Sequence, residues 1–425
     1  MTRRRRLLMF AFYFPPLGMG GVQRPLKFAK YLPEFGWNVT VITAEPGGYV
    51  EYDPTLLDDV PDGVDIIRVK SLDPSSFANN RVRETGGTPS SSKLSHLIEQ
   101  AREWARWPDA KIHFARVAAR EALRRSDALR FDAVYTTSPP PSIHSAGLRV
   151  RRALSIPWVA DFRDPWMVAV DDWGPTAIHR RYAENLRARI LRQADQVLVM
   201  NDMVADVFQT AAAQQRLSII PNGYDEDDFT GVTQQQRGDD FIVAFYGTDS
   251  PHTDIRPVLD LITEFNAHNP QRSVRLVHVG TTLGAAVHTH PAYTTTGYLP
   301  HRDAIAQLCN ADAAVITLSP DPSLRMTIPG RTYEVLRSLR PILCMAPAGS
   351  LLAQILEPFH GVWTCDFGDT GCALSALDQI TRLDRRTAAR DVASIQCFDR
   401  RTQTFQLSGI LDELVTLPQP DRGGE

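Results

Sequence analysis

The stretch from Thr327 to Leu336 carries residue types that could hold a nucleotide. A Pro-Gly pair turns the chain there, and a helix beginning behind it would present free main-chain N–H groups. Arg331 adds a positively charged fork, so a diphosphate could bind here, beside Ile328 and Gly330. Glu334 does not suit a phosphate, but its carboxylate can accept two hydrogen bonds from a vicinal diol such as that of a ribose. The alternative for Glu334 is a favourable charge at a helix amino-terminus, worth about 0.3–1 kcal/mol.

A glycine-rich corner near the amino-terminus offers a second anion site. The apolar run Leu7–Phe12 is typical of a strand buried in a parallel sheet. Two prolines and three glycines follow, Gly20 and Gly21 among them, and glycine permits positive φ and close approach of the backbone to a ligand. A helix over 22–35 is predicted next, and its amino-terminus suits phosphate; a simple tight turn is the alternative. The basic residues of this helix are expected mostly on its solvent face: Arg24, Lys27 and Lys30.

Charged residues also cluster where the predicted strand 157–162 ends. Asp161 and Arg163 stand at this point, and open α/β folds bind ligands at the carboxyl ends of their parallel strands. We therefore predict catalytic roles for both residues. The alternative is an internal Asp–Arg ion pair that braces the loop.

Two series of alternating strands and helices must position these residues. A chain of 425 residues usually forms more than one core, and the second series restarts after the acidic, polar stretch 226–240, which we interpret as a linker. Strands of the second series end at Gly247 and Gly280, which we predict to lie at the nucleotide site. The pattern predicts an α/β fold of two Rossmann-like domains, 1–222 and 223–399, with parallel sheets facing a central cleft.

The composition indicates a globular protein with a cytoplasmic location. No apolar run reaches the length of about 18 residues that a membrane span needs. The five cysteines are odd in number and form no C-x-x-C pair, so we expect free buried thiols, a reducing compartment and no metal site.

The charge is distributed unevenly along the chain. Residues 1–152 hold 23 Lys and Arg against 16 Asp and Glu, whereas the remainder holds 23 against 33. A basic half could meet a phosphate-bearing acceptor or anionic lipid headgroups at the inner face of the cell membrane. Trp104 and Trp107, among arginines of a predicted helical region over 94–130, could rest on that surface. A solvated basic surface and core packing of the tryptophans are the alternatives. No nucleic-acid partner is expected.

Five motifs, taken in order, resemble a known enzyme family. They lie at Tyr13–Arg24, Ala160–Asp164, Ile220–Asp225, Gly297–His301 and Pro329–Glu334. The set resembles the retaining nucleotide-sugar glycosyltransferases of family 4, which have the GT-B fold, and in particular a bacterial subgroup that builds surface polysaccharides. This resemblance implies a donor nucleotide in the carboxyl-terminal domain and an acceptor in the amino-terminal domain. It also implies a final helix, over about 400–416, that crosses back to the first domain, and catalysis without a metal.

The resemblance also implies roles for single residues. Glu334 is similar to the second glutamate of the family's E-x7-E signature, which holds the ribose. Gly20 and Gly21 look like the loop that meets the donor phosphates, and Leu299 falls where the family's backbone contacts the base.

The sequence departs from the family pattern at several positions. Met326 stands where the first glutamate of the signature is expected, and Asp321 or main-chain amides could substitute for it. Thr248 lies near the first of two positions that are cationic in the family, and Arg256 is the candidate for the second. Arg163 stands where many members carry an active-site histidine.

The sequence thus predicts a metal-independent hexosyltransferase without a cofactor beyond its donor. It would move a hexose from a nucleoside diphosphate sugar to a glycan or lipid-linked acceptor, with the anomeric configuration retained. Arg256, Arg331 and the Gly20–Gly21 corner would stabilise developing charge, and the acceptor would be oriented near Asp161. The alternatives are a sugar-nucleotide epimerase of the same fold, which needs no acceptor, and a catalytically silent scaffold.

Overall fold

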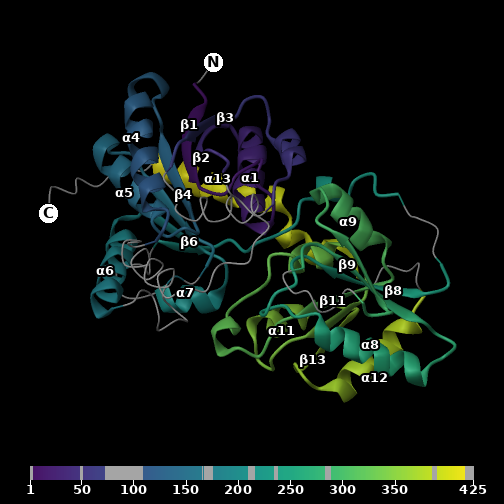
Figure 1. Cartoon of the computed structure of the whole chain (residues 1–425). Coiled ribbons are helices and arrows are strands. Elements are labelled where there is room, and N and C mark those ends of the chain that lie inside the picture. The colour runs from purple at the N-terminus through teal and green to yellow at the C-terminus, as the bar shows by residue number, and fades with distance from the viewer. Residues whose placement is uncertain are drawn as a thin grey trace, which may run out of the picture. The chain divides into compact units, whose positions relative to one another are not determined.

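The chain folds as two compact units, each built on a parallel sheet. Unit 1 comprises Met1–Pro221 and Arg401–Glu425, and unit 2 comprises Asn222–Arg400. The computed structural model describes residues 3–47, 51–71, 109–164, 166, 176–208, 216–233, 238–282, 289–384 and 390–416 (Figure 1). Trp104 and Trp107, predicted to contact a membrane, lie outside these residues. Within the described ranges, no helix combines the length and apolar character that crossing a membrane would require.

Unit 1 contains a parallel sheet in the order β3-β2-β1-β4-β5-β6-β7. Its strands are β1 (Arg5–Ala11), β2 (Trp37–Ala44), β3 (Asp65–Val69), β4 (Ala133–Ser138), β5 (Trp158–Phe162), β6 (Gln196–Val199) and β7 (Leu217–Ile219). The apolar run that predicted β1 is fully buried from Leu7 to Ala11, because this strand lies in the middle of the sheet with β2 and β4 as neighbours. The strand order reverses between β1 and β4, so their carboxyl ends mark the ligand-binding position of an open α/β sheet.

The helices of unit 1 cover this sheet. They are α1 (Gly20–Tyr31), α4 (Ile112–Leu129), α5 (Ile143–Leu154), α6 (Ala177–Gln193) and α7 (Asp202–Phe208), with the 3-10 helices η1 (Leu32–Phe35) and η2 (Pro54–Asp59). The final helix, α13 (Arg400–Thr416), also packs on this unit, as Figure 1 shows in yellow. Its Leu407 and Leu411 are fully buried in the core that contains Trp37, whose Nε1 donates to Asp412 Oδ1 at 2.9 Å. The predicted return of the last helix to the first domain is confirmed.

Unit 2 repeats the architecture with a smaller sheet in the order β10-β9-β8-β11-β12-β13. Its strands are β8 (Phe241–Tyr246), β9 (Val274–Val279), β10 (Tyr293–Gly297), β11 (Ala313–Thr317), β12 (Ile342–Met345) and β13 (Val362–Cys365). Its helices are α8 (Arg256–His268), α9 (His301–Asn310), α10 (Thr332–Arg337), α11 (Leu351–Leu356) and α12 (Thr370–Thr381), with η3 (Glu226–Phe229), η4 (Pro322–Leu324) and η5 (Val392–Phe398). The order reverses between β8 and β11, so the carboxyl ends of these two strands mark the corresponding position in unit 2.

The predicted linker and the predicted free thiols are wrong in part. The stretch 226–240 begins with η3, a turn that Asp225 caps by accepting from the Asp227 N–H at 3.2 Å. Phe229, at the end of η3, is buried in the core of unit 2, so this part of the stretch is not a linker. Cys365 and Cys372 form a disulfide between the end of β13 and the first turn of α12. The sequence spacing of seven residues gave no sign of this contact, which the strand-to-helix turn creates by bringing the two Cα atoms to 5.7 Å.

Close packing of α5 on the sheet leads to a stability prediction. A Cβ on Gly147 would lie 2.4 Å from Trp158 Nε1 and 2.7 Å from Thr136 Cγ2, both buried. Gly147→Ala should therefore lower the free energy of unfolding by about 1–3 kcal/mol, measured by urea denaturation. Gly409→Ala is the control, because a Cβ there meets nothing within 4 Å and α13 should gain up to about 1 kcal/mol. Equal effects of the two substitutions would show that the contacts at Gly147 do not limit packing.

Candidate functional site

Arg331 is a shielded cation with unused hydrogen-bonding groups, at the reversal point of the unit 2 sheet. Its guanidinium lies over the ring of Phe245, 4.4 Å from the centroid. Nη1 donates to Thr248 O at 3.3 Å, but Nε and Nη2 are buried and have no partner among the described residues. Burial lowers the pKa of Arg331 to about 10, so the group is still charged at neutral pH.

A second buried arginine of the same unit, Arg390, shows that open donors on a buried guanidinium are unusual. Arg390 is shielded as well, and burial likewise lowers its pKa to about 10. All three of its nitrogens donate to main-chain carbonyls, including those of Leu336 and Arg340, each at 3.0 Å. Because buried donors are nearly always paired, the two open donors of Arg331 indicate room for an anionic ligand.

Gly247 and Gly280 make the space that Arg331 occupies. A Cβ on Gly247 would lie 2.8 Å from both Cδ and Nη1 of Arg331, and one on Gly280 would lie 2.2 Å from Gly247 O. Both glycines also have positive φ, 112° and 150°. His278 Nε2 lies 2.8 Å from Gly247 O, which fixes the loop after β8. The predicted donor residues Gly247, Thr248, Gly280 and Arg331 are therefore brought together.

Glu334 lies in the first turn of α10, just after Arg331, and its side chain is partly shielded from solvent. Its carboxylate accepts a hydrogen bond from Tyr246, and Oε1 is 3.5 Å from His301 Nε2. Burial raises the pKa of Glu334 and the nearby Asp228 charge adds to this, while His301 and the Tyr246 hydrogen bond oppose it; the net shift is upward. The helix that carries Glu334, α10, has only six residues, so its dipole is a weak explanation for a carboxylate at this position.

The other predicted residues of unit 2 have less specific surroundings. Ile328 is buried in the core cluster and Leu299 packs against it, whereas Gly330 is exposed. The Arg256 guanidinium is exposed and forms an ion pair with Asp254 at 2.5 Å, at the start of α8. The roles predicted for these residues stay predictions.

In unit 1 the glycine corner leads into a helix as predicted, but the residue with positive φ is not a glycine. Gly20 and Gly21 are the first residues of α1, and neither has positive φ; the left-handed conformation is taken by Met19, with φ 71°. The expectation that glycine supplies this conformation was wrong. The first turn of α1 has no side-chain cap and no acidic residue, and Arg163 Nη1 donates to Gly21 O at 2.5 Å. Arg163 also donates from Nε to Ser138 O at 2.7 Å, so it ties the corner to the end of β4.

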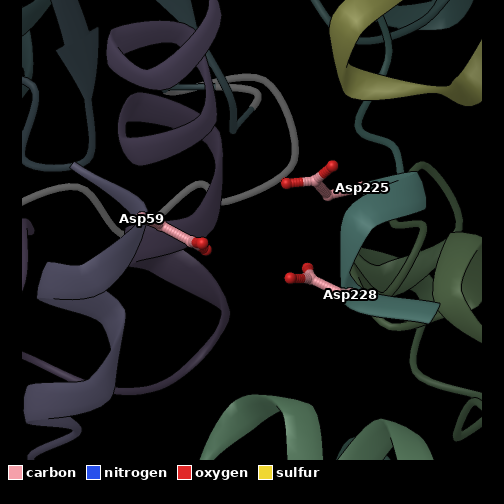
Figure 2. Close-up of side chains that lie close together, drawn as sticks. All are labelled: Asp59, Asp225 and Asp228. Atoms are coloured by element: carbon pink, nitrogen blue, oxygen red, sulfur yellow. The ribbon is translucent and has the colours of Figure 1, made fainter. Parts of the chain in front are cut away.

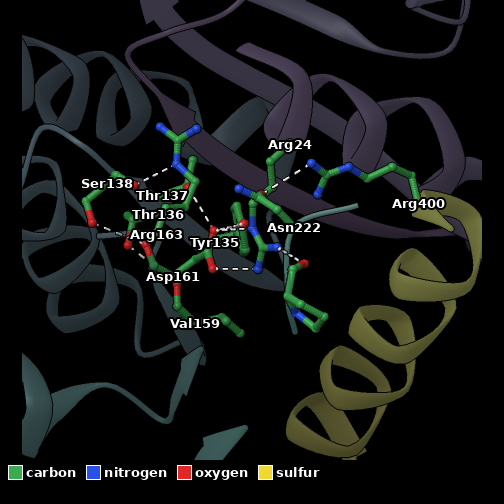
Figure 3. Close-up of polar contacts among 11 residues, drawn as sticks. Arg24, Tyr135, Thr136, Thr137, Ser138, Val159, Asp161, Arg163, Asn222 and Arg400 are labelled. Atoms are coloured by element: carbon green, nitrogen blue, oxygen red, sulfur yellow. Dashed lines mark hydrogen bonds and ion pairs between the residues drawn. The ribbon is translucent and has the colours of Figure 1, made fainter. Parts of the chain in front are cut away.

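Asp161 accepts hydrogen bonds from three side chains, one on α1 and two on β4, as Figure 3 shows. Its two oxygens accept from Nε and Nη2 of Arg24 at 2.9 and 2.8 Å, from Tyr135 Oη at 2.6 Å and from Thr137 Oγ1 at 2.8 Å. Its side chain is fully buried, and that of Arg24 is 1% exposed. Burial alone would raise the pKa of Asp161, but the Arg24 charge and these hydrogen bonds hold it below its usual value.

This geometry favours an internal ion pair, with Arg24 rather than Arg163 as the cation. The catalytic roles of Asp161 and Arg163 stay predictions. The expectation that the basic residues of α1 face solvent was wrong, because Lys27 is also buried and pairs with Asp59 at 2.6 Å. Figure 2 shows Asp59 at the end of η2. Helix periodicity indicates the direction of a side chain, but it does not show whether a buried carboxylate lies in that direction.

Comparison with known proteins identifies a family that matches the first unit. Residues 20–223 match the family described as glycosyl transferase 4-like domain. The chain has a glycosyltransferase 4-like domain. The predicted resemblance to this family is thus confirmed. A comparison with curated proteins gave no match.

Solved structures of glycosyltransferases resemble the whole chain. The sucrose-phosphate synthase of Thermosynechococcus elongatus is 14% identical with a TM-score of 0.63, covering 97% of this chain and 99% of its own. The catalytic domain of starch synthase IV from Arabidopsis thaliana, bound to ADP and acarbose, is 11% identical with a TM-score of 0.59, covering 98% and 100%. WaaG, a glycosyltransferase involved in lipopolysaccharide biosynthesis, is 13% identical with a TM-score of 0.53, covering 98% and 100%. The predicted GT-B fold, with two parallel-sheet α/β domains, is confirmed.

Sequence reasoning missed several residues that surround Glu334. His301 and Tyr246 stood inside motifs or strands without a role, and Asp228 was assigned to the linker. Figure 2 shows Asp228 on η3 and Asp225 just before it, and Asp228 is 4% exposed. Tyr246 ends β8 and His301 begins the helix after β10, so their place at carboxyl strand ends could have identified these two residues. Asp228 precedes β8 and carries no such signal.

Proposed function

We propose that the chain transfers a hexose from a nucleoside diphosphate sugar to a glycan or lipid-linked acceptor. Unit 2 would hold the donor, with the diphosphate on Arg331 and the ribose on Glu334. The observation that carries this assignment is the pair of open donors on the buried Arg331 guanidinium, which an anion would complete. The starch synthase domain named above was solved with ADP, which supports a nucleoside diphosphate as the donor's leaving group.

The transfer would proceed with retention and without a metal ion. The acceptor oxygen bonds to the anomeric carbon on the face that the diphosphate leaves, and the acceptor proton passes to a phosphate oxygen. Arg331 stabilises the charge that develops on the diphosphate, with Arg256 as a second cation. Asp161 and Arg163 would act by holding the sheet edge and the Gly20–Gly21 corner where the acceptor is oriented. The remaining contacts of the donor are proposed for Gly247, Thr248, Gly280, Leu299, Ile328 and Gly330.

The acceptor is proposed to belong to a surface polysaccharide or glycoconjugate. WaaG, one of the structurally similar glycosyltransferases, is involved in lipopolysaccharide biosynthesis. The basic charge of residues 1–152 suits an acceptor that carries phosphate or sits in an anionic membrane. We further propose that the protein acts at the inner face of the cell membrane.

Nucleotide release from a panel of donors tests the proposed activity. UDP-, GDP-, TDP- and ADP-sugars are incubated with the chain, with and without a glycan or lipid-linked acceptor mixture. Release that depends on the acceptor is the expected result. Conversion of the donor without an acceptor would indicate an epimerase, and a chain that binds and converts none of them would be a silent scaffold.

The raised pKa of Glu334 predicts a pH dependence of nucleotide binding. Only the ionised carboxylate accepts two hydrogen bonds, so affinity should be full above the pKa of Glu334 and fall as the pH drops through it. Because that pKa is raised, the loss should begin at a higher pH than for an ordinary glutamate, whose pKa is about 4.3. Titration calorimetry from pH 8 downward measures it, and Glu334→Gln should flatten the profile. A wild-type profile as flat as that of the variant would remove Glu334 from the ribose.

A further inference from the structure

The imidazole of His301 lies between two carboxylates of unit 2. Its Nε2 is 3.2 Å from Asp228 Oδ2 and 3.5 Å from Glu334 Oε1. Asp228 belongs to η3, His301 begins α9 and Glu334 belongs to α10, so three separate segments meet at one nitrogen. The side chains of Asp228, His301 and Glu334 are only 3, 11 and 13% exposed.

Two carboxylates in a shielded place oppose each other's ionisation. Each negative charge disfavours the other, and poor solvation adds to this effect. A protonated Glu334 could not accept from both hydroxyls of a diol, because one of its oxygens would carry a proton. A donor that touches both carboxylates removes this conflict.

Other charged and titratable groups also face this cluster, and Tyr246 lies close enough to feel the charges of both Glu334 and Asp228. The Tyr246 hydroxyl donates to Glu334, and the charge of Arg400 also acts on Glu334. Arg302 Nε lies 3.9 Å from Asp228 Oδ1, and its side chain is 62% exposed. His301 Nε2 lies within 3.5 Å of both Asp228 and Glu334.

We propose that His301 is a positioning residue for Glu334 and thereby sets the preference for a ribose over a deoxyribose. This rests on the proposed function, in which Glu334 holds the ribose diol. With a proton on Nε2, His301 donates to Asp228 Oδ2 and lies 3.5 Å from Glu334 Oε1, so it favours the ionised form of Glu334 and holds that carboxylate toward the diol. The donor class that follows is a ribonucleoside diphosphate sugar, and 2′-deoxynucleoside diphosphate sugars such as those of dTDP are disfavoured.

The test compares ribonucleotides and deoxyribonucleotides on the full chain. Calorimetry with UDP, GDP and ADP first identifies a nucleotide that the wild type binds, and its 2′-deoxy analogue is then titrated between pH 5.5 and 8.5. The variants are His301→Ala, His301→Gln and Glu334→Gln, with Asp303→Asn as a control on the exposed side of the same helix. The wild type and the control should prefer the ribonucleotide by about tenfold, the effect of one to two hydrogen bonds to a charged group.

His301→Ala should bring this preference to within about twofold by weakening ribonucleotide binding, with deoxynucleotide affinity unchanged. The pH at which ribonucleotide affinity is half lost should move upward, because two unrelieved carboxylates hold a proton more tightly. His301→Gln restores an N–H donor without the charge, so it should recover part of the preference. This variant also carries the test if the alanine variant does not fold.

Three results would overturn the proposal. If both His301 variants keep the wild-type preference and pH profile while Glu334→Gln loses them, His301 has no positioning role and the proposed function stands. If Glu334→Gln also keeps the preference, the assignment of the ribose to Glu334 fails as well. If the wild type binds none of the three nucleotides, this inference fails, and the proposed function fails with it if dTDP is not bound either.

Discussion

Asp161→Ala is expected to lower the free energy of unfolding by about 3–5 kcal/mol, a large part of a typical domain's stability. The substitution leaves the Arg24 guanidinium charged and buried, and among the described residues only Pro221 O still accepts from it, at 2.7 Å. Tyr135 and Thr137 lose their acceptor at the same time. Chemical denaturation followed by circular dichroism measures the change.

Two further variants separate this buried pair from ordinary ion pairs. Arg382→Ala breaks an exposed pair with Asp378 on α12 and should leave the free energy of unfolding almost unchanged. Arg24→Met combined with Asp161→Leu removes both buried charges, so it should cost less than Asp161→Ala alone. A small loss in Asp161→Ala, similar to that of Arg382→Ala, would contradict the account of Asp161 as the centre of the unit 1 brace.

Arg331→Met should change stability and nucleotide affinity in opposite directions. The wild-type guanidinium is shielded from water with two open donors, so an apolar side chain of similar length should raise the melting temperature. Affinity for a nucleoside diphosphate should fall by between about tenfold and about 100-fold, because hydrogen bonds to the phosphates are lost. Differential scanning fluorimetry and titration calorimetry measure the two effects.

Arg390→Met is the matched control for this prediction. The Arg390 guanidinium is buried to a similar degree, but its nitrogens donate to four main-chain carbonyls, of His360, Leu336, Arg340 and Gly361. Its replacement leaves these acceptors unpaired and should lower the melting temperature. Loss of stability of similar size in both variants would mean that Arg331 serves the fold and not a ligand.

The sequence predicted the elements and their order well, because both sheets are parallel and their strands are buried on both faces. Apolar runs such as Leu7–Phe12, followed by glycine or proline turns, identify such strands without any tertiary information. The edge at which chemistry would gather was predictable for the same reason, since every strand of a parallel sheet ends there. The grouping of Gly247, Gly280 and Arg331 follows from this topology.

Partners of buried charges could not be predicted in this way. Arg24 and Lys27 resemble solvent-facing residues of an amphipathic helix, and only the tertiary fold brings Asp161 and Asp59 to them. The position of Asp228 was also unpredictable, because an acidic stretch usually indicates a linker. Only the fold shows that Phe229 anchors this stretch in the core. The disulfide between Cys365 and Cys372 depends on a strand-to-helix turn whose geometry composition does not reveal.

The central claim is that unit 2 binds the diphosphate of a sugar nucleotide through Arg331. The most direct measurement is the ratio of affinities for a nucleoside diphosphate and for the corresponding nucleoside, in the wild type and in Arg331→Met. We expect the ratio to fall by at least about tenfold in the variant, with nucleoside affinity unchanged. An unchanged ratio, in a variant that still binds both ligands, would contradict the claim.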